Sequence, residues 1–239
     1  SPGHPDKMAD QLAAYCAKTM RELGARRTAI EVMGGHGTLV FMGESDYQDD
    51  DEVLSDKVEQ YAIELINRNR TDKMLDGARY DFIYCFEKQS PEIARGVDKT
   101  ETETGAGDQG ITTGYWFNTN DGMPTEHSLA KSLCRFLYGK WQRDGETQVS
   151  FCEGTQTIVT IVVSWCGVSQ DRLADAVNEW LKEHKDVMSE SLDIVINPAG
   201  DWAVGGFDAD TGLTGRKLAV DFYGANVPLG GGNLHGKDF

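Results

Sequence analysis

The stretch TAIEVMGGHGTLVFM, residues 28–42, places two β-rich runs on either side of a glycine-rich connection. Residues 28–33 and 38–42 are mostly β-branched or apolar, and the connection Gly34-Gly35-His36-Gly37 has the composition of a tight turn. The stretch therefore predicts a β-hairpin.

Amphipathic helices are predicted on both sides of this hairpin. Apolar side chains recur at helical spacing at Met8, Leu12, Cys16, Met20 and Leu23 before it, and at Leu54, Val58, Tyr61 and Leu65 after it. Gly24 is the expected end of the first helix. Residues 80–86 are then predicted to form a strand. The polar, glycine-containing stretch 87–109 is predicted to be a long loop, and such loops often carry function.

The second half of the chain repeats this order. Residues 129–137 predict a helix, 148–152 and 157–165 two strands, 173–181 another helix and 192–196 another strand. Each half thus contains helix, two strands, helix and strand, a duplication of pattern without obvious sequence identity. The expected fold class is α+β, with repeated α/β units in which helices cover mixed or antiparallel sheets. The expected division is 1–120 and 121–239, with interleaving of the two units left open.

The composition is that of an acidic globular protein. The chain has 239 residues, 39% of them hydrophobic, and a formal net charge of −16 at pH 7. This charge disfavours a general nucleic-acid binder, whose surface must neutralise phosphates. It leaves room for one small cationic pocket within an acidic surface.

The cysteines and the hydropathy of the sequence indicate the cellular compartment in which the protein is expected. The five cysteines are scattered and include no CxxC pair, which favours a reduced compartment over a disulfide framework or a zinc site. No apolar run approaches the roughly 20 residues that cross a bilayer, and no signal peptide is visible. A cytoplasmic protein is therefore expected.

Four short segments combine charged side chains with glycine. They are GHPDK at residues 3–7, GAGDQG at 105–110, DTGLTGRK at 210–217 and GKD at 236–238. Glycine lets the backbone come close to a ligand, and basic groups recur in these segments of an otherwise acidic chain. Together they suggest a local pocket for a polyanion. Taken alone, GHPDK also fits a plain helix start with a proline and an acid in its first turn.

In this order, the segments resemble those of the methionine adenosyltransferase (S-adenosylmethionine synthetase) family, over residues 1–239. The stretch KQSPEI at residues 88–93 is similar to the family's KQSPDI. Members of the family make S-adenosylmethionine from ATP and L-methionine: the methionine sulfur attacks the 5′ carbon of ATP, and the triphosphate chain is released as pyrophosphate plus phosphate. The resemblance implies a short form that lacks the C-terminal part and holds two of the family's three related units.

For the triphosphate, the resemblance implies a set of cationic groups. The catalytic residues, of which all but Lys7 are also ATP-binding, would be His4, Lys7, Arg216, Lys217 and Lys237. His4 would donate to the leaving phosphate oxygen, and Arg216 and Lys217 would clamp the phosphates. Asp6 would hold magnesium. The competing interpretations are solvated bases on the surface and fraying of Lys237 near the chain end.

For methionine and adenosine, the resemblance implies residues from several segments. The methionine-binding residues would be Glu44, Gln89, Asp108 and Asp210. Asp108 would also contact ATP, and Trp202 would stack on adenine. Glu31 would support a potassium ion. Without the resemblance, these residues are interpreted as solvated acids, a structural glycine turn and a buried indole.

The cofactors implied by the resemblance are Mg2+, as a pair of ions per site, and K+. The partners implied are ATP, L-methionine and a second copy of the chain, in a homodimer whose active sites lie at the subunit interface. No nucleic-acid or membrane partner is expected.

Three departures from the family pattern leave two alternatives open. Glu146 stands where the family has a phosphate-binding lysine, and Asp201 stands where it has a basic residue. After Asp238, a lysine and a magnesium-ligating aspartate of the family have no counterpart. The chain is then also compatible with a non-catalytic or regulatory homologue that binds nucleotide or pairs with a full-length subunit. The second alternative is one half of a split enzyme.

Overall fold

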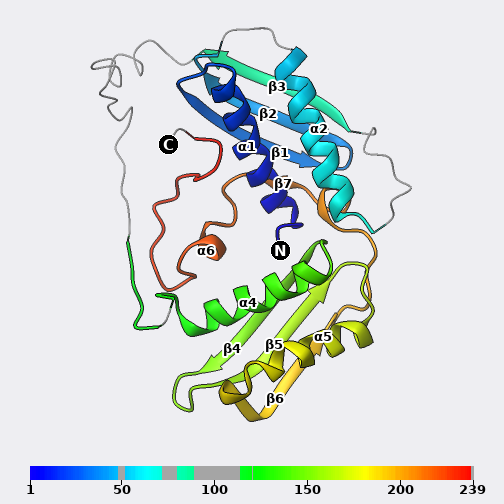
Figure 1. The fold of residues 1–239 in the computed structure, drawn as a ribbon, viewed down its shortest axis with the longest axis vertical. Helices are drawn as coiled ribbons and strands as arrows, with labels where there is room; N and C mark the ends of the chain where they lie inside the picture. Colours follow the sequence, from blue (N-terminus) through cyan, green and yellow to red (C-terminus); the bar gives the residue numbers. More distant parts are fainter. Residues whose placement is uncertain (48–51, 72–79, 89–113, 120, 238–239) are drawn as a thin grey trace.

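Two units with the same order of elements make up most of the chain (Figure 1). The computed structural model describes residues 1–47, 52–71, 80–88, 114–119 and 121–237. The first unit contains α1 (Pro5–Glu22), β1 (Thr28–Gly35), β2 (Thr38–Ser45), α2 (Glu52–Asn69) and β3 (Asp81–Lys88). The second contains α4 (Thr125–Lys140), β4 (Gly145–Cys152), β5 (Thr157–Trp165), α5 (Gln170–Lys182), the short helix η2 (Lys185–Val187) and β6 (Met188–Ile196). The predicted α+β class and the order of elements in each half are confirmed.

Both units have the same sheet topology. The first sheet has the strand order β3-β2-β1-β7 and the second the order β4-β5-β6, where β7 is Gly212–Leu213. In each unit the first two strands are antiparallel and the third is parallel to the second. The sheets are therefore mixed, which is one of the two alternatives expected from the sequence. The predicted loop over 87–109 begins with the last two residues of β3, and its part from residue 89 on lies outside the described residues.

The hairpin predicted at residues 28–42 is present. His36 and Gly37 connect β1 to β2, and both have positive φ angles, 52° and 89°. Two consecutive residues of this kind give a type I′ turn, whose twist matches that of the flanking strands. The turn fixes the register in which Glu31 lies opposite Met42.

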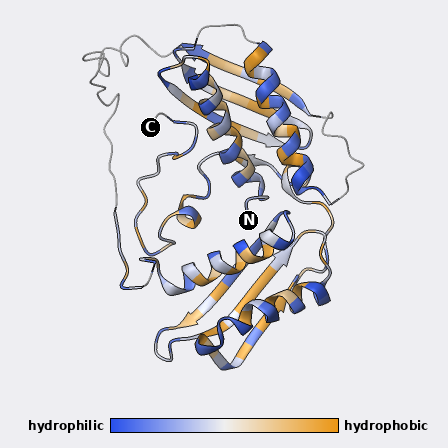
Figure 2. Cartoon of the chain, in the orientation of Figure 1, coloured by the Kyte–Doolittle hydropathy of each residue, from blue (hydrophilic) through white to orange (hydrophobic). Residues whose placement is uncertain are grey.

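Helices cover one face of each sheet, and each unit has its own core (Figures 1 and 2). In the first unit, alternate residues of β1 and β2 such as Ile30, Val32 and Phe41 are fully buried under α1 and α2. The opposite face of this sheet carries none of the helices that the structure describes (Figure 1). None of the described helices is long and apolar enough to span a membrane.

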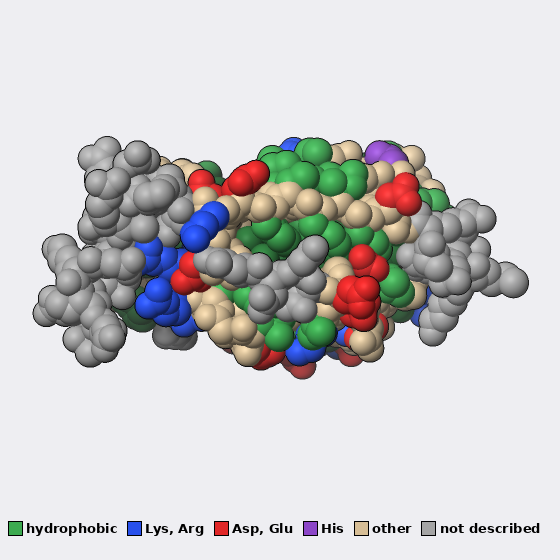
Figure 3. All heavy atoms as spheres, turned by 90° about the horizontal axis from the view of Figure 1, so that it is seen from above, with side chains coloured by type: hydrophobic (Ala, Val, Ile, Leu, Met, Phe, Trp, Pro, Cys, Tyr) green, Lys and Arg blue, Asp and Glu red, His purple; other side chains and the backbone are tan. Residues whose placement is uncertain are grey.

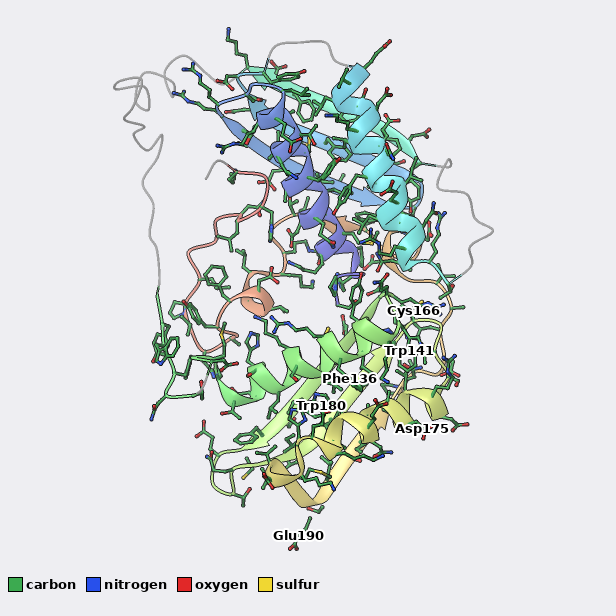
Figure 4. The ribbon with its side chains drawn as sticks, viewed as in Figure 1. Phe136, Trp141, Cys166, Asp175, Trp180 and Glu190 are labelled. Carbon is green, nitrogen blue, oxygen red and sulfur yellow. The ribbon has the colours of Figure 1, made fainter. Side chains whose placement is uncertain are left out.

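The second core is closed by tryptophans of α5 and β5. The Trp180 indole donates to Ser132 Oγ on α4 at 3.1 Å, and the Trp165 indole donates to the Trp141 carbonyl at 3.2 Å. Figure 4 places Trp141 and Trp180 among the elements of this unit, whereas Asp175 and Glu190 project outward. All five cysteines are free, as expected for a chain without a disulfide framework.

After β6 the chain returns to the first unit. The short helix η3 (Gly206–Asp208) brings Phe207 into the first core, β7 pairs with β1, and α6 (Leu218–Asp221) lies between the two units (Figure 1). Further along, Lys237 forms a bridge with Ala29. The N-terminal amine of Ser1 in turn donates to the Gly145 carbonyl of the second unit at 2.7 Å. The division into 1–120 and 121–239 stays a prediction.

Candidate active site

The N-terminus of α1 positions the charged residues of GHPDK. His4 is the N-cap, and its Nδ1 accepts a hydrogen bond from the Asp6 backbone N–H at 3.1 Å. Pro5 follows in the first turn, where its missing N–H costs nothing. This start places Asp6, Lys7 and Asp10 in the first two turns of the helix. GHPDK is therefore both a helix start with a proline in its first turn and the origin of a cluster of charged side chains.

Gly212 lets the DTGLTGRK segment lie directly against this helix start. A Cβ atom at Gly212 would lie 2.2 Å from the backbone carbon and oxygen of Pro5, so a larger residue does not fit. Beyond it, the Leu213 N–H donates to Asp6 Oδ1 at 2.9 Å and the Gly215 N–H to Asp10 Oδ1 at 3.0 Å. The carboxylates of Asp6 and Asp10 thus hold the backbone next to the two basic residues of this segment, which are Arg216 and Lys217.

Asp6 holds both cations of DTGLTGRK. Lys217 Nζ lies 2.5 Å from Asp6 Oδ2, and Arg216 Nη1 lies 3.5 Å from Asp6 Oδ1. The side chain of Asp6 is only 1% exposed. Burial alone raises the pKa of this carboxyl, but the hydrogen bonds from Lys217 and Leu213 outweigh burial and lower it below its usual value. Asp6 therefore stays ionised at neutral pH and keeps its two bases in place.

Lys7 is the centre of a neighbouring charged cluster. Its Nζ donates to Asp10 Oδ2 at 2.9 Å and to Asp221 Oδ2 at 2.6 Å, and His235 Nε2 lies 3.6 Å and 3.8 Å from the same two oxygens. Burial lowers the pKa of Lys7, but the two carboxylates raise it by more. The ligand atoms of Asp10, Asp221 and His235 lie within 4.8 Å of one another, as in a metal site. The Lys7 ammonium already bonds both carboxylates, so this cluster is filled by a side-chain cation.

Glu31 and Lys237 meet beside this cluster. Lys237 Nζ lies 3.7 Å from Glu31 Oε1, while Thr214 Oγ1 and Asn233 Nδ2 donate to Glu31 Oε2, the latter at 2.8 Å. Lys237 is also fixed by its backbone bridge to β1. The GKD segment is therefore joined to the site through the same strand that pairs with β7.

A cavity of about 770 Å³ opens between the two units. His4, Lys7 and Lys217 line it from the first unit and the return segment, and residues of α4, β4 and β5 line it from the second. Its volume is within the range of sites for small molecules. His4 Nε2 faces Glu146 Oε1 across 3.9 Å. Burial and the nearby Lys217 charge lower the pKa of His4 below 6.5, so its imidazole is neutral at about pH 7.

The structure brings together most of the residues expected to handle phosphate, whereas Glu44, Asp210 and Trp202 lie elsewhere on the described chain. His4, Arg216 and Lys217 gather on Asp6, Lys7 lies in the neighbouring cluster with Asp10 and Asp221, and Glu31 and Lys237 lie beside them. Glu44 lies on the face of the first sheet that no helix covers, opposite Ala29. Gln89 and Asp108 lie outside the described residues.

Two expected ligand contacts lie away from the cavity, and one departure from the family pattern has a structural partner. Asp210 is exposed, and its carboxylate accepts from the next backbone N–H, at 2.7 Å. The Trp202 carbonyl accepts from Gly167, and the indole is not among the groups that line the cavity. Asp201 accepts from Asn197 Nδ2 at 2.9 Å. Because Asn197 has a positive φ of 41°, this bond supports a strained turn.

Sequence reasoning missed the contribution of α4. His127, Lys131 and Arg135 line the cavity from this helix. They are four residues apart, the spacing that places side chains on one face of a helix. Since the sequence predicts a helix over 129–137, a basic stripe at this spacing is the pattern that could have revealed them.

Comparisons with known proteins identify relatives of this chain. The family model described as S-adenosylmethionine synthetase, C-terminal domain, matches residues 204–239. The chain is 34% identical over 262 residues to an S-adenosylmethionine synthase of Wolinella succinogenes, covering 99% of this chain and 66% of the relative. It is 34% identical over 275 residues to that of Petrotoga mobilis, covering 99% and 67%.

A solved structure extends the similarity to the fold. The structure described as an unusual S-adenosylmethionine synthetase from Campylobacter jejuni superimposes with a TM-score of 0.81 at 28% identity. The match covers 99% of this chain and 66% of that one. The chain thus spans about two thirds of the length of the relatives it matches.

Proposed function

The chain belongs to the S-adenosylmethionine synthetase family, and on this premise we propose that it synthesises S-adenosylmethionine from ATP and L-methionine. The observation that carries the proposal is the convergence of His4, Arg216 and Lys217 on the buried Asp6, with His4, Lys217 and the neighbouring Lys7 at the wall of the cavity. In a chain with a net charge of −16, such a group of bases supports a site for a polyanion.

The reaction asks little of the protein except positioning and charge. The methionine sulfur forms a bond to the 5′ carbon of ATP, the bond from that carbon to the triphosphate oxygen breaks, and the electron pair stays on that oxygen. A thioether is already a nucleophile, so no general base is needed. Arg216 and Lys217 would stabilise the charge that builds on the leaving phosphates. The neutral His4 would donate a hydrogen bond to the leaving oxygen.

Magnesium fits the proposed site through Asp6. Mg2+ prefers oxygen ligands and in phosphate sites uses one or two carboxylates together with the phosphates themselves. Asp6 offers one such carboxylate, and Lys217 Nζ at 2.5 Å takes the place next to it that a cation would take. Asp6 would hold the metal, and Lys217, which pairs with this carboxylate in the structure, would bind the phosphates. A bound Mg2+ would supply further neutralisation of the triphosphate charge.

Potassium fits less well. The groups around Glu31 are hydrogen-bond donors from Thr214 and Asn233 and the ammonium of Lys237, whereas a hard cation needs a shell of oxygen ligands. The assignment of K+ to Glu31 stays a prediction, and no step of the reaction is attributed to it.

The remaining contacts are proposed to come from a second copy of the chain. Leu213, Met33, Val40 and Ile83 lie in one row across the four strands of the first sheet, on the face without helices. Leu213, Met33 and Ile83 are 38%, 44% and 45% exposed. Seen from the end of the molecule at which β3 forms the sheet edge, hydrophobic side chains gather across the middle of the surface (Figure 3). Exposed apolar patches of this kind mark interaction sites.

In such a homodimer, Glu44 on the same sheet face would serve the site of the partner. Gln89, Asp108 and Asp210 are assigned with Glu44 to methionine, and Trp202 with Asp108 to adenosine; all of these assignments rest on the family resemblance. A homodimer with sites shared between subunits would account for the placement of Glu44 on the open sheet face rather than in the cluster around Asp6.

The direct test is product formation. The purified chain is incubated with ATP, L-methionine and Mg2+, and S-adenosylmethionine is detected by mass spectrometry. Product is expected from the parent and from Lys18→Met, whose lysine pairs with Glu22 on the exposed side of α1. Much less is expected from Lys217→Met. No product from the parent at high protein concentration would reject the proposal.

One observation favours a second candidate, a nucleotide-binding homologue without turnover. Glu146 places a carboxylate at the cavity, 3.9 Å from His4, where it repels phosphate. Calorimetric binding of ATP without any product would favour this candidate over the enzyme.

A further inference from the structure

We propose that Lys131 and Arg135 of α4 form a second cationic wall of the cavity and bind the terminal phosphates of the polyphosphate chain. The inference rests on the proposed function for the identity of the ligand. It assigns the phosphates to side chains of both units, rather than to the cluster around Asp6 alone.

Helix packing directs these two side chains to the cavity. Leu133 and Leu137 are fully buried in the core of the second unit, which fixes the rotation of α4 about its axis. His127, Lys131 and Arg135 lie at intervals of four on another face and line the cavity. Figure 1 places this helix as the part of the second unit nearest to the N-terminus and α6.

Lys131 meets the charges of the first unit at Asp221. Its Nζ donates to the Asp221 carbonyl at 3.0 Å, while Lys7 Nζ donates to the carboxylate of the same residue at 2.6 Å. Burial and then the positive charge of Arg135 lower the pKa of Lys131, Asp221 and Asp121 raise it, and Lys7 lowers it by less. Lys131 and Arg135 are thus a pair of like charges four residues apart on one helix, and a bound anion would stabilise such a pair. This supports a site that is completed by a bound polyanion.

Arg135 is the unpaired member of the wall. It is exposed and makes no ion pair with any residue that the structure describes. A guanidinium presents a fork of donors suited to phosphate oxygens. Among the described residues that line the cavity, bases outnumber acids: Lys7, Lys131, Arg135 and Lys217 against Glu146 and Asp221.

The experiment measures binding of inorganic tripolyphosphate by titration calorimetry. The variants are Lys131→Gln and Arg135→Gln, with Lys140→Gln as control, because Lys140 lies on the same helix but pairs with Glu179 away from the cavity. Each cavity variant is expected to raise the Kd at least about tenfold, the usual effect of losing one charge-assisted contact. The control is expected to keep the Kd of the parent.

The inference is overturned if the parent does not bind tripolyphosphate, or if both cavity variants bind it like the parent. Should Lys131→Gln unfold, Arg135→Gln alone decides, since an exposed side chain without an ion pair has little part in folding. A parent that binds tripolyphosphate in this variant-sensitive way but forms no S-adenosylmethionine sustains the inference and rejects the proposed function. If the parent forms S-adenosylmethionine but both variants bind tripolyphosphate like the parent, the proposed function stands and the inference about Lys131 and Arg135 is rejected.

Discussion

A buried carboxylate can serve a phosphate site by holding the bases that bind the phosphates, as well as by holding a metal ion. Asp6 is in this position, because Lys217 and Arg216 are its cationic neighbours and the backbone of Leu213 fixes its other oxygen. The lowered pKa of Asp6 follows from these contacts. In the absence of phosphate, the carboxylate keeps the bases oriented and compensates their charge.

Lys217 has two proposed roles, to bind the leaving phosphates and to pair with the buried Asp6, and the variant Lys217→Met tests both. Loss of one charge-assisted contact to the leaving group is expected to lower kcat/KM by about ten- to a hundredfold, since such contacts contribute about 1.5–3 kcal/mol. The variant also leaves Asp6 buried with one partner fewer, so its melting temperature is expected to fall. Adding Asp6→Asn should restore part of the stability but none of the activity. Full recovery of activity in the double variant would contradict the catalytic role of Lys217.

The Asp208 carboxylate should make the stability of the fold depend on acid pH. It accepts from Arg70 Nε at 2.6 Å, from Arg70 Nη2 at 2.9 Å and from the Tyr80 hydroxyl at 2.8 Å. Burial raises its pKa, but these donors lower it below the usual 3.8. The unfolded state then binds the proton more tightly, so the stabilisation is complete above about pH 4 and is lost as the pH falls through the folded-state pKa.

Asp208→Asn is therefore expected to flatten the fall in stability between about pH 5 and pH 2 and to cost about 1–3 kcal/mol at neutral pH. Urea unfolding followed by circular dichroism at a series of pH values measures both effects. Asp175→Asn is the matched control, because Asp175 projects outward from α5 (Figure 4). An unchanged pH dependence in Asp208→Asn would show that this carboxylate does not couple protons to folding.

Among the elements, the two-residue strand β7 is important because it positions the segment that carries Arg216 and Lys217. It pairs with β1 and carries the backbone that leads to Arg216 and Lys217. Gly212→Ala would place a Cβ 2.2 Å from the Pro5 backbone. We expect a loss of about 1–3 kcal/mol in the free energy of unfolding, as for other overpacked sites, and a loss of activity from displaced bases.

Gly232→Ala provides the comparison for this variant, since no atom of the described residues beyond the two chain neighbours lies within 4 Å of a Cβ at Gly232. It is expected to keep the stability and activity of the parent. If Gly212→Ala is as stable and active as Gly232→Ala, β7 can move away from α1 without harm, and close contact is not needed to orient the two bases.

The same two-residue strand explains why part of the fold could not be predicted from the sequence. Helices and strands of both units follow from apolar periodicity, and the hairpin follows from its glycine-rich turn. Residues 206–221 have no such period, and their path depends on Phe207 entering the first core and on Gly212 meeting Pro5. The four charged, glycine-containing segments predicted a shared pocket for a polyanion. They did not predict that side chains of α4 in the other unit would line this pocket.

For the whole molecule, the open face of the first sheet is an apolar surface that no described helix of the single chain covers. Its apolar row from Leu213 to Ile83 spans all four strands, and Glu44 lies on the same face. A second copy that covers this row would bury Met33 and Ile83 and bring Glu44 toward another cavity. Oligomeric state and activity should then change together.

Ile83→Lys tests this coupling, because Ile83 lies on β3, at the end of the row away from β7 and the bases. A lysine buried without a partner costs about 3–5 kcal/mol, so the dimer Kd is expected to rise by about two to three decades. Light scattering after size exclusion measures the mass, and S-adenosylmethionine formation is followed at the same protein concentrations. Val53→Lys, at an exposed position of α2, is expected to change neither. A dimer that persists in Ile83→Lys, or a monomer that keeps full activity, would remove the sheet face from the proposed site.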